Sequence, residues 1–232
     1  MEKILHFLRD LNLNNNREWF NAHKSEYLEA KRIFDAFALD LCEAVRGFDS
    51  SIGPLGIGDM TYRIYRDIRF SPDKSPYKCH FGVFICPQGR KSGYCGYYFQ
   101  VSAADKGGWE SSHIVAAGDY MTEPKVLKII REDIELGGGD FRRICNSADS
   151  RFAIDTENSL KKVPKGFPAD SPDAEFLKLK NFCLVYHPDE SFVTSPNLKK
   201  NLVDMFRTAA PFVTYVNRAV RYSREEADSM IL

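Results

Sequence analysis

The feature that most constrains the fold of this chain is a change in hydrophobic spacing near residue 60. Between residues 17 and 46, large apolar side chains recur at helical spacing. From residue 60 to 117, short runs of β-branched and aromatic residues alternate with turns such as Ser71-Pro72-Asp73 and Pro87-Gln88-Gly89. Because strands joined by short connections pair side by side, residues 60–117 are predicted to form consecutive antiparallel strands of one sheet.

Helices are predicted on both sides of this sheet. Residues 3–11 form a short amphipathic helix, and Asn15 is predicted to cap the next one, with Glu18 favouring its positive end. After the sheet, Thr122 is predicted to cap a helix that ends at Gly137. One more strand is expected within residues 181–186.

The C-terminal part is predicted to contain two helices. One opens at Ser195-Pro196, and Pro211 starts the other, because proline disrupts a helix interior. The polar tail from about Arg221 is expected to fray. The predicted class is therefore α+β: a single domain over residues 1–232, with a mainly antiparallel sheet flanked by N-terminal and C-terminal helices.

Charge and cysteine usage narrow the classes of function. The 232 residues hold 32 basic and 32 acidic side chains, so no global field attracts nucleic acid or an acidic membrane. No apolar stretch is long enough to span a bilayer, and the N-terminus is not typical of a signal peptide. Six cysteines without a Cys-x-x-Cys pair indicate reduced, mostly buried thiols in a cytoplasmic protein. The sequence does not indicate an oligomeric state.

The segment from Arg63 to Lys78 is the strongest candidate for a functional site. It contains five cations and two carboxylates: Arg63, Arg66, Arg69, Lys74, Lys78, Asp67 and Asp73. Arginine forks and lysines suit a phosphate or carboxylate, so we expect these five cations to bind an anionic small molecule in a cleft. Asp67 and Asp73 are the candidate acid or base if the site is catalytic. Alternatively, Asp67, Asp73 and Glu110 neutralise the cations in a purely structural network.

Strand parity makes a separate prediction for Arg66. On a strand, Ile64, Arg66, Ile68 and Phe70 share one face, and the opposite face presents Arg63, Tyr65, Asp67 and Arg69. Arg66 is therefore expected to be largely buried and bound to a carboxylate or carbonyl, with truncation costing roughly 3–5 kcal/mol.

The chain resembles a known family at four places. They are Asn14-Asn15-Asn16-Arg17-Glu18-Trp19-Phe20, the run from Arg63 to Lys78, Gly96-Tyr97-Tyr98, and Leu160-Lys161-Lys162-Val163-Pro164-Lys165-Gly166-Phe167. These motifs are similar to those of the bacterial and fungal proteins grouped as domain-of-unknown-function family 2461. The resemblance implies one conserved domain over nearly the whole chain. It implies no activity, so it assigns no catalytic residue.

Three interpretations of function remain open. The first is an anion-binding protein, with or without catalysis. The second is a non-catalytic module that recognises an acidic partner. The third is nucleic-acid binding with tyrosines and Trp109 stacking on bases, which the neutral net charge disfavours. No cofactor is expected. No metal is expected either, since His80, His113 and His187 lack a short-spaced ligand pair.

Overall fold

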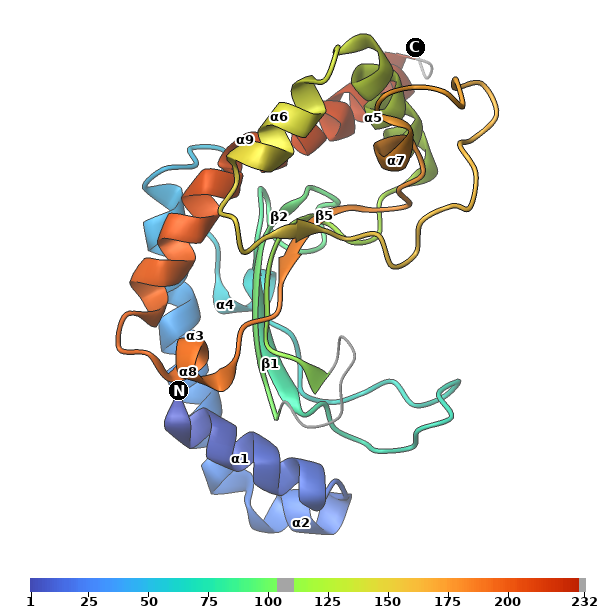
Figure 1. Cartoon of the computed structure of the whole chain (residues 1–232). Coiled ribbons are helices and arrows are strands. Elements are labelled where there is room, and N and C mark those ends of the chain that lie inside the picture. Colours follow the sequence, from blue (N-terminus) through green and yellow to red (C-terminus); the bar gives the residue numbers. More distant parts are fainter. Residues whose placement is uncertain (104–110, 230–232) are drawn as a thin grey trace. The chain divides into compact units, whose positions relative to one another are not determined.

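The computed structural model describes residues 1–103 and 111–229 (Figure 1). Trp109 and Glu110 lie outside the described residues. The strands form one five-stranded antiparallel sheet in the order β1-β2-β3-β5-β4. The strands are β1 (His80–Ile85), β2 (Gly96–Ser102), β3 (Ile114–Asp119), β4 (Ala153–Ile154) and β5 (Phe182–Tyr186). The predicted α+β class is therefore confirmed.

Helices precede, interrupt and follow the strands. The N-terminal ones are α1 (Glu2–Leu13), α2 (Arg17–Ala22), α3 (Lys24–Arg46) and α4 (Ile57–Met60). The later ones are α5 (Pro124–Leu136), α6 (Asp140–Ser147), α7 (Ala174–Leu177), α8 (Glu190–Thr194) and α9 (Leu198–Ser229). No helix in the described part of the chain is both long and apolar enough to cross a membrane.

The chain forms two compact units. Unit 1 comprises Met1–Lys91, Tyr98–Val115 and His187–Val203, and unit 2 comprises Ser92–Tyr97, Ala116–Tyr186 and Asp204–Leu232. Strands β2 and β3 and helix α9 therefore each contribute residues to both units. The prediction of a single domain stays a prediction.

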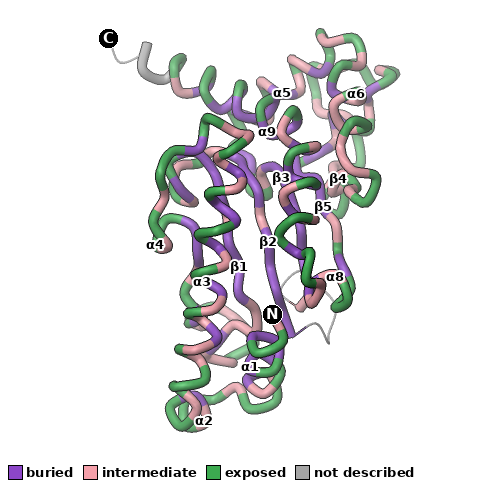
Figure 2. The backbone as a smooth tube through the Cα atoms, turned by 90° about the vertical axis from the view of Figure 1, so that its left-hand side faces the viewer, coloured by how far each residue is buried: buried purple, intermediate pink, exposed green. Residues whose placement is uncertain are grey.

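The core of unit 1 is aromatic. Phe81 on β1 lies against Phe7 of α1 and Phe34 of α3, with ring centroids 6.5 and 5.4 Å away. Figure 2 shows that α3 is buried along one side only, while β1 is buried along most of its length. The predicted amphipathic stripe of residues 17–46 is thus the surface that packs on the sheet.

The core of unit 2 is centred on Phe141 of α6. Its ring contacts those of Phe176, Phe182, Phe212 and Tyr215, with centroids between 5.1 and 5.6 Å apart. These partners come from α7, β5 and α9, so one aromatic side chain joins three elements. Gly118 on β3 is required here, because a Cβ atom at this position would lie 2.2 Å from the carbonyl oxygen of Phe182.

Three predictions of local structure were wrong. Residues 61–79 do not form a strand. They take part only in two isolated antiparallel bridges, one between Thr61 and Val83 of β1 and one between Tyr65 and Tyr77. Helix α9 continues through Pro211 and through the predicted frayed tail as far as Ser229. Apolar residues on both sides of Pro211, including Phe206 and Phe212, are fully buried, so packing outweighs the lost backbone hydrogen bond.

Two caps were predicted one residue too early. Asn16, not Asn15, caps α2, and its side chain accepts a hydrogen bond from the Trp19 N–H (2.9 Å). The N-cap of α5 is Glu123, and the Thr122 hydroxyl donates to the carbonyl of Asp119 instead (3.2 Å). Asn15 does not cap this helix and instead forms hydrogen bonds with Tyr77.

Candidate functional site

Residues 62–78 form an irregular hairpin, which we call the hairpin arm. In Figure 1 it is the long cyan-green loop that precedes β1. Its two sides are joined by backbone hydrogen bonds from the Arg66 N–H to Pro76 O (3.0 Å) and from the Lys78 N–H to Ile64 O (2.8 Å). The two sides pair only near the base, so residues 67–75 make a wide tip. This tip carries most of the charged residues of the predicted site.

Asn15 holds the base of the hairpin arm. Its side-chain oxygen accepts from the Tyr77 N–H (3.1 Å), and its amide nitrogen donates to Tyr77 O (2.9 Å) and to Cys79 Sγ (3.3 Å). The Phe20 ring stacks on Tyr77 with centroids 4.0 Å apart. From the sequence, Asn15 was predicted only to cap the helix that follows it. The turn between α1 and α2 instead positions the arm.

Arg66 is paired within the arm, as parity predicted. Its side chain is 17% exposed and forms an ion pair with Asp73, with a longer contact to Ser75 O (3.5 Å). Lys74 donates to the carbonyl of Ile68 (3.0 Å). The parity holds for buried Ile64 but fails for Phe70, which is 94% exposed, because pairing has ended before the tip. Part of the predicted structural network therefore exists.

Arg69 and Asp67 form a local, bidentate pair at the tip. The guanidinium donates to both carboxylate oxygens at 2.9 and 2.6 Å, and the Arg69 backbone N–H also points to Asp67 (3.3 Å). Arg63 has no hydrogen bond or ion pair of its own among the described residues, but its charge helps to stabilise the Asp67 carboxylate. Both oxygens of Asp67 thus accept hydrogen bonds from Arg69, and the donors of Arg63 make no hydrogen bond among the described residues.

Both carboxylates of the arm are strongly acidic. Hydrogen bonds from Arg69 lower the pKa of Asp67 from 3.8 to about 2. Hydrogen bonds from Ser75, followed by that from Arg66, hold the pKa of Asp73 well below its usual range. Both groups are therefore ionised and engaged at neutral pH. This geometry gives no support to the predicted role of either residue as a general acid.

Tyr62, at the base of the arm, carries two cations on its ring. Lys78 Nζ lies 5.5 Å and the Arg90 guanidinium carbon 5.1 Å from the ring centroid. Arg90 has no carboxylate partner among the described residues, and its Nε–H is buried without an acceptor. Such an orphaned donor is costly unless something binds it. Arg90 follows the predicted Pro87-Gln88-Gly89 turn, but nothing in the sequence linked it to the segment at 63–78.

A polar stripe on β2 lies beside this ring. Tyr98 meets Tyr62 edge to face at 6.4 Å, and its hydroxyl donates to the side-chain oxygen of Gln100 (2.6 Å). Gln100 in turn donates to Ser112 O (2.9 Å). Gly82 makes room for Tyr98, since a Cβ atom there would lie 2.6 Å from the tyrosine oxygen. The base of the arm thus joins two cations, two phenols and an amide.

The weaker sequence candidates do not join this cluster. No group of three or more potential metal ligands occurs in the described part of the chain. His113 is buried, and its Nδ1 accepts from the Ser102 N–H (3.2 Å). None of the six cysteines, all of which lie in the described part of the chain, forms a disulfide, and four of them are buried. Burial raises the pKa of Cys145 to about 12, which leaves that thiol protonated and unreactive at neutral pH.

Comparison with known proteins identifies a family whose description names no function. A family model described as "Conserved hypothetical protein (DUF2461)" matches residues 3–215. No curated protein and no solved structure matches the chain.

Proposed function

The chain belongs to this conserved hypothetical family, DUF2461, and we propose that it binds an anionic small molecule, phosphorylated or carboxylated, at the base of the hairpin arm. Arg90 and Lys78 would hold the anion beside Tyr62, and Arg63, which follows Tyr62 in the sequence, is a further candidate cation. The observation that carries the proposal is the buried Arg90 Nε–H without an acceptor. An oxygen of a phosphate or carboxylate would satisfy this donor and gain a charge-assisted hydrogen bond.

The charge count of the arm supports the same ligand class. Of its five cations, Arg66 and Arg69 are paired with the two carboxylates of the arm, and Lys74 is bonded to a backbone carbonyl. We therefore place the centre of the site at Arg90, whose buried Nε–H has no acceptor among the described residues, rather than at Arg69. The cleft predicted from sequence, and a cytoplasmic location, belong to this proposal. Catalysis does not, because the carboxylates of Asp67 and Asp73 are ionised, which does not suit a general acid, and are bound by Arg69 and Arg66, which does not suit a general base.

The test is a titration of the ¹⁵N-labelled chain with inorganic phosphate, sulfate and acetate. We expect saturable shifts at the amides of Tyr62, Lys78, Arg90 and Tyr98. Arg90→Gln should weaken phosphate binding at least about tenfold, because a charge-assisted hydrogen bond is lost. Arg32→Gln, on an exposed ion pair of α3, is the matched control and should bind as the wild type does. If no shift saturates at millimolar anion, the proposal is wrong.

A second candidate function has its own observation. Phe70 is 94% exposed at the tip, and Arg69 lies over its ring at 5.9 Å. An exposed aromatic among cations is typical of a surface that binds an acidic segment of a partner protein. An oligoglutamate peptide that binds the wild type but not Phe70→Ser, while phosphate fails to bind, would favour this interaction module over the small-molecule site.

A further inference from the structure

Unit 2 contains a pocket of about 380 Å³ between three helices. Each helix turns one face toward it: Asp133 from α5, Tyr215 and Arg218 from α9, and a stripe from α6. Gly137, the C-cap of α5, completes the lining. The α6 residues are Asp140, Arg143, Ile144 and Ser147. Their spacing of three and four residues places them on one side of that helix. The pocket is thus formed by regular elements rather than by loops.

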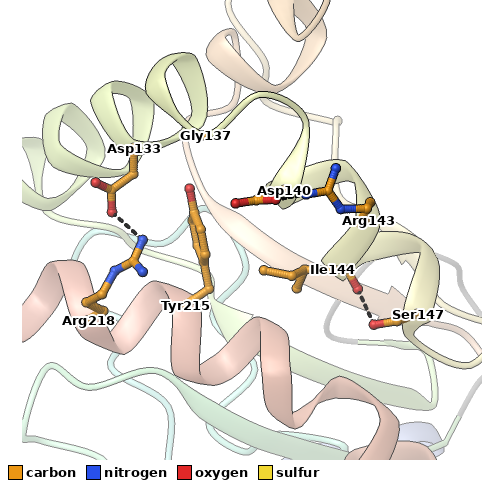
Figure 3. A pocket seen from close by; sticks show the side chains of 8 residues that line it. All are labelled: Asp133, Gly137, Asp140, Arg143, Ile144, Ser147, Tyr215 and Arg218. Atoms are coloured by element: carbon orange, nitrogen blue, oxygen red, sulfur yellow. Dashed lines mark hydrogen bonds and ion pairs between the residues drawn. The ribbon is translucent and has the colours of Figure 1, made fainter.

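The hydroxyl of Tyr215 is the unusual group in this pocket. The residue is only 7% exposed, and its hydroxyl is buried without a hydrogen-bond partner among the described residues. The ring is fixed by Phe141 (centroids 5.2 Å apart) and by the Arg218 guanidinium, whose carbon lies 4.9 Å from the ring centroid. Figure 3 shows the hydroxyl standing between the Asp133–Arg218 and Asp140–Arg143 pairs. Buried phenols usually have a partner, so this one is placed to receive it from outside the chain.

The charged groups around the hydroxyl balance each other. Arg218 donates to Asp133 at 2.9 Å, and Arg143 pairs with Asp140. Each arginine makes one side-chain hydrogen bond among the described residues, and each aspartate uses one oxygen, so donors and acceptors remain on both sides of the phenol. A ligand with a net charge would meet two groups of its own sign. A neutral ligand with separated charges would meet a partner at each end.

We propose that this pocket binds a small zwitterion that carries a carboxylate and an ammonium group, the chemistry of a free α-amino acid. Its carboxylate accepts from the Tyr215 hydroxyl and from a spare N–H of Arg218. Its ammonium group donates to the unused oxygens of Asp133 and Asp140. The volume is at the lower end of the usual range for ligand pockets, about 300–1,000 Å³, which suits such a small molecule.

The test uses three related probes: L-alanine, propionate, which is L-alanine without the ammonium group, and ethylamine, which is L-alanine without the carboxylate. In the ¹⁵N-labelled chain we expect L-alanine at about 10 mM to shift amides of residues 133–147 and 215–218 saturably. The other two probes should bind at least about tenfold more weakly, because each leaves one pair of protein groups without a partner. L-Alanine is small enough to fit the volume in any orientation.

Tyr215→Phe separates binding from structure. The change removes only the hydroxyl, which makes no hydrogen bond within the described part of the chain, so the melting temperature should stay the same or rise. The affinity for L-alanine should fall at least about tenfold. Tyr222→Phe, on a half-exposed tyrosine of the same helix outside the pocket, is the matched control and should leave binding unchanged.

Three results would overturn the inference. They are no saturable shift with L-alanine, equal binding of propionate or ethylamine, and unchanged L-alanine binding in Tyr215→Phe. Arg90→Gln should bind L-alanine normally, so failure of this inference is distinguishable from failure of the anion site.

Discussion

The hairpin arm and the three-helix pocket both gather arginines and aspartates, but they do so in opposite ways. The arm holds five cations against two carboxylates within one run of sequence, and its ion pairs join residues two and seven positions apart. The pocket holds two of each sign, and its Arg218–Asp133 pair spans 85 positions. An excess of one sign indicates a charged ligand, whereas a balanced set indicates a neutral one.

The two regions also differ in what holds them in place. The arm has little regular structure, and Asn15 and Phe20 fix its base from outside. The pocket walls are helix faces whose other sides bury Ile130, Ile134, Phe141 and Phe212 in the core of unit 2. The arm should therefore be sensitive to single side chains that the pocket does not have.

The largest effect is expected for Asn15→Ala. This change removes the partners of both the N–H and the carbonyl of Tyr77, a residue only 4% exposed. Orphaned backbone groups of this kind cost about 1–3 kcal/mol each, so the free energy of unfolding should fall by roughly 2–6 kcal/mol in urea titration. Amide protection within residues 62–78 should fall in the same variant.

Asn14→Ala provides the matched control for the preceding change. Asn14 is exposed and its amide donates only to the carbonyl of Asp10 in α1 (2.9 Å). The expected loss is within about 0.5 kcal/mol, as for most surface substitutions. Equal losses for the two asparagines would contradict the idea that the arm depends on Asn15.

The sequence predicted the regular part of the fold well. Residues 17–46 are helical except at His23, and the runs around Val83, Phe99 and Val115 are strands, because long periodic segments pack as their patterns require. The errors at residues 61–79 and at Pro211 have one cause. Local propensity was decisive in the prediction, but tertiary contacts were decisive in the protein: Asn15 and Phe20 for the arm, and the buried sides of α9 for the proline.

The candidate site could be predicted only in part. The cations of the arm are contiguous, so their excess was visible in the sequence, and so was the pairing of Arg66. Arg90 and Tyr62 lie 28 positions apart, and their contact depends on the path of the chain through the hairpin arm and β1. The three-helix pocket was not predicted at all, because a balanced set of charges from separate helices has no local signature.

Smaller losses of stability are expected when one arginine–aspartate pair is broken, either Arg66–Asp73 in the arm or Arg218–Asp133 in the pocket. Arg66→Ala should lower the free energy of unfolding by about 1–2 kcal/mol, because its guanidinium is 17% exposed but its partner Asp73 is 58% exposed. This is less than expected for a fully buried charge. Arg218→Ala should cost about 0–1 kcal/mol, since that side chain is 59% exposed. If Arg218→Ala is the more destabilising change in urea, the pocket and not the arm relies on its ion pair.

The smallest expected effect is a loss of stability when Asp67 of the arm is protonated, which happens only at acidic pH. The pKa of Asp67 in the folded protein is lowered from 3.8 to about 2. A carboxylate with a depressed pKa stabilises the folded state fully above its unfolded pKa. This contribution is lost as the pH falls from there through about 2. Carboxyl ¹³C shifts of the folded signals should therefore give a midpoint near 2 for Asp67, and this midpoint should rise toward 3.8 in Arg69→Gln, because hydrogen bonds from Arg69 are the main cause of the shift. A midpoint near 3.8 in the wild type would mean that the bidentate pair does not persist in solution. Arg69 would then have its guanidinium available to an anion, and the centre of the proposed site would move toward the tip of the arm.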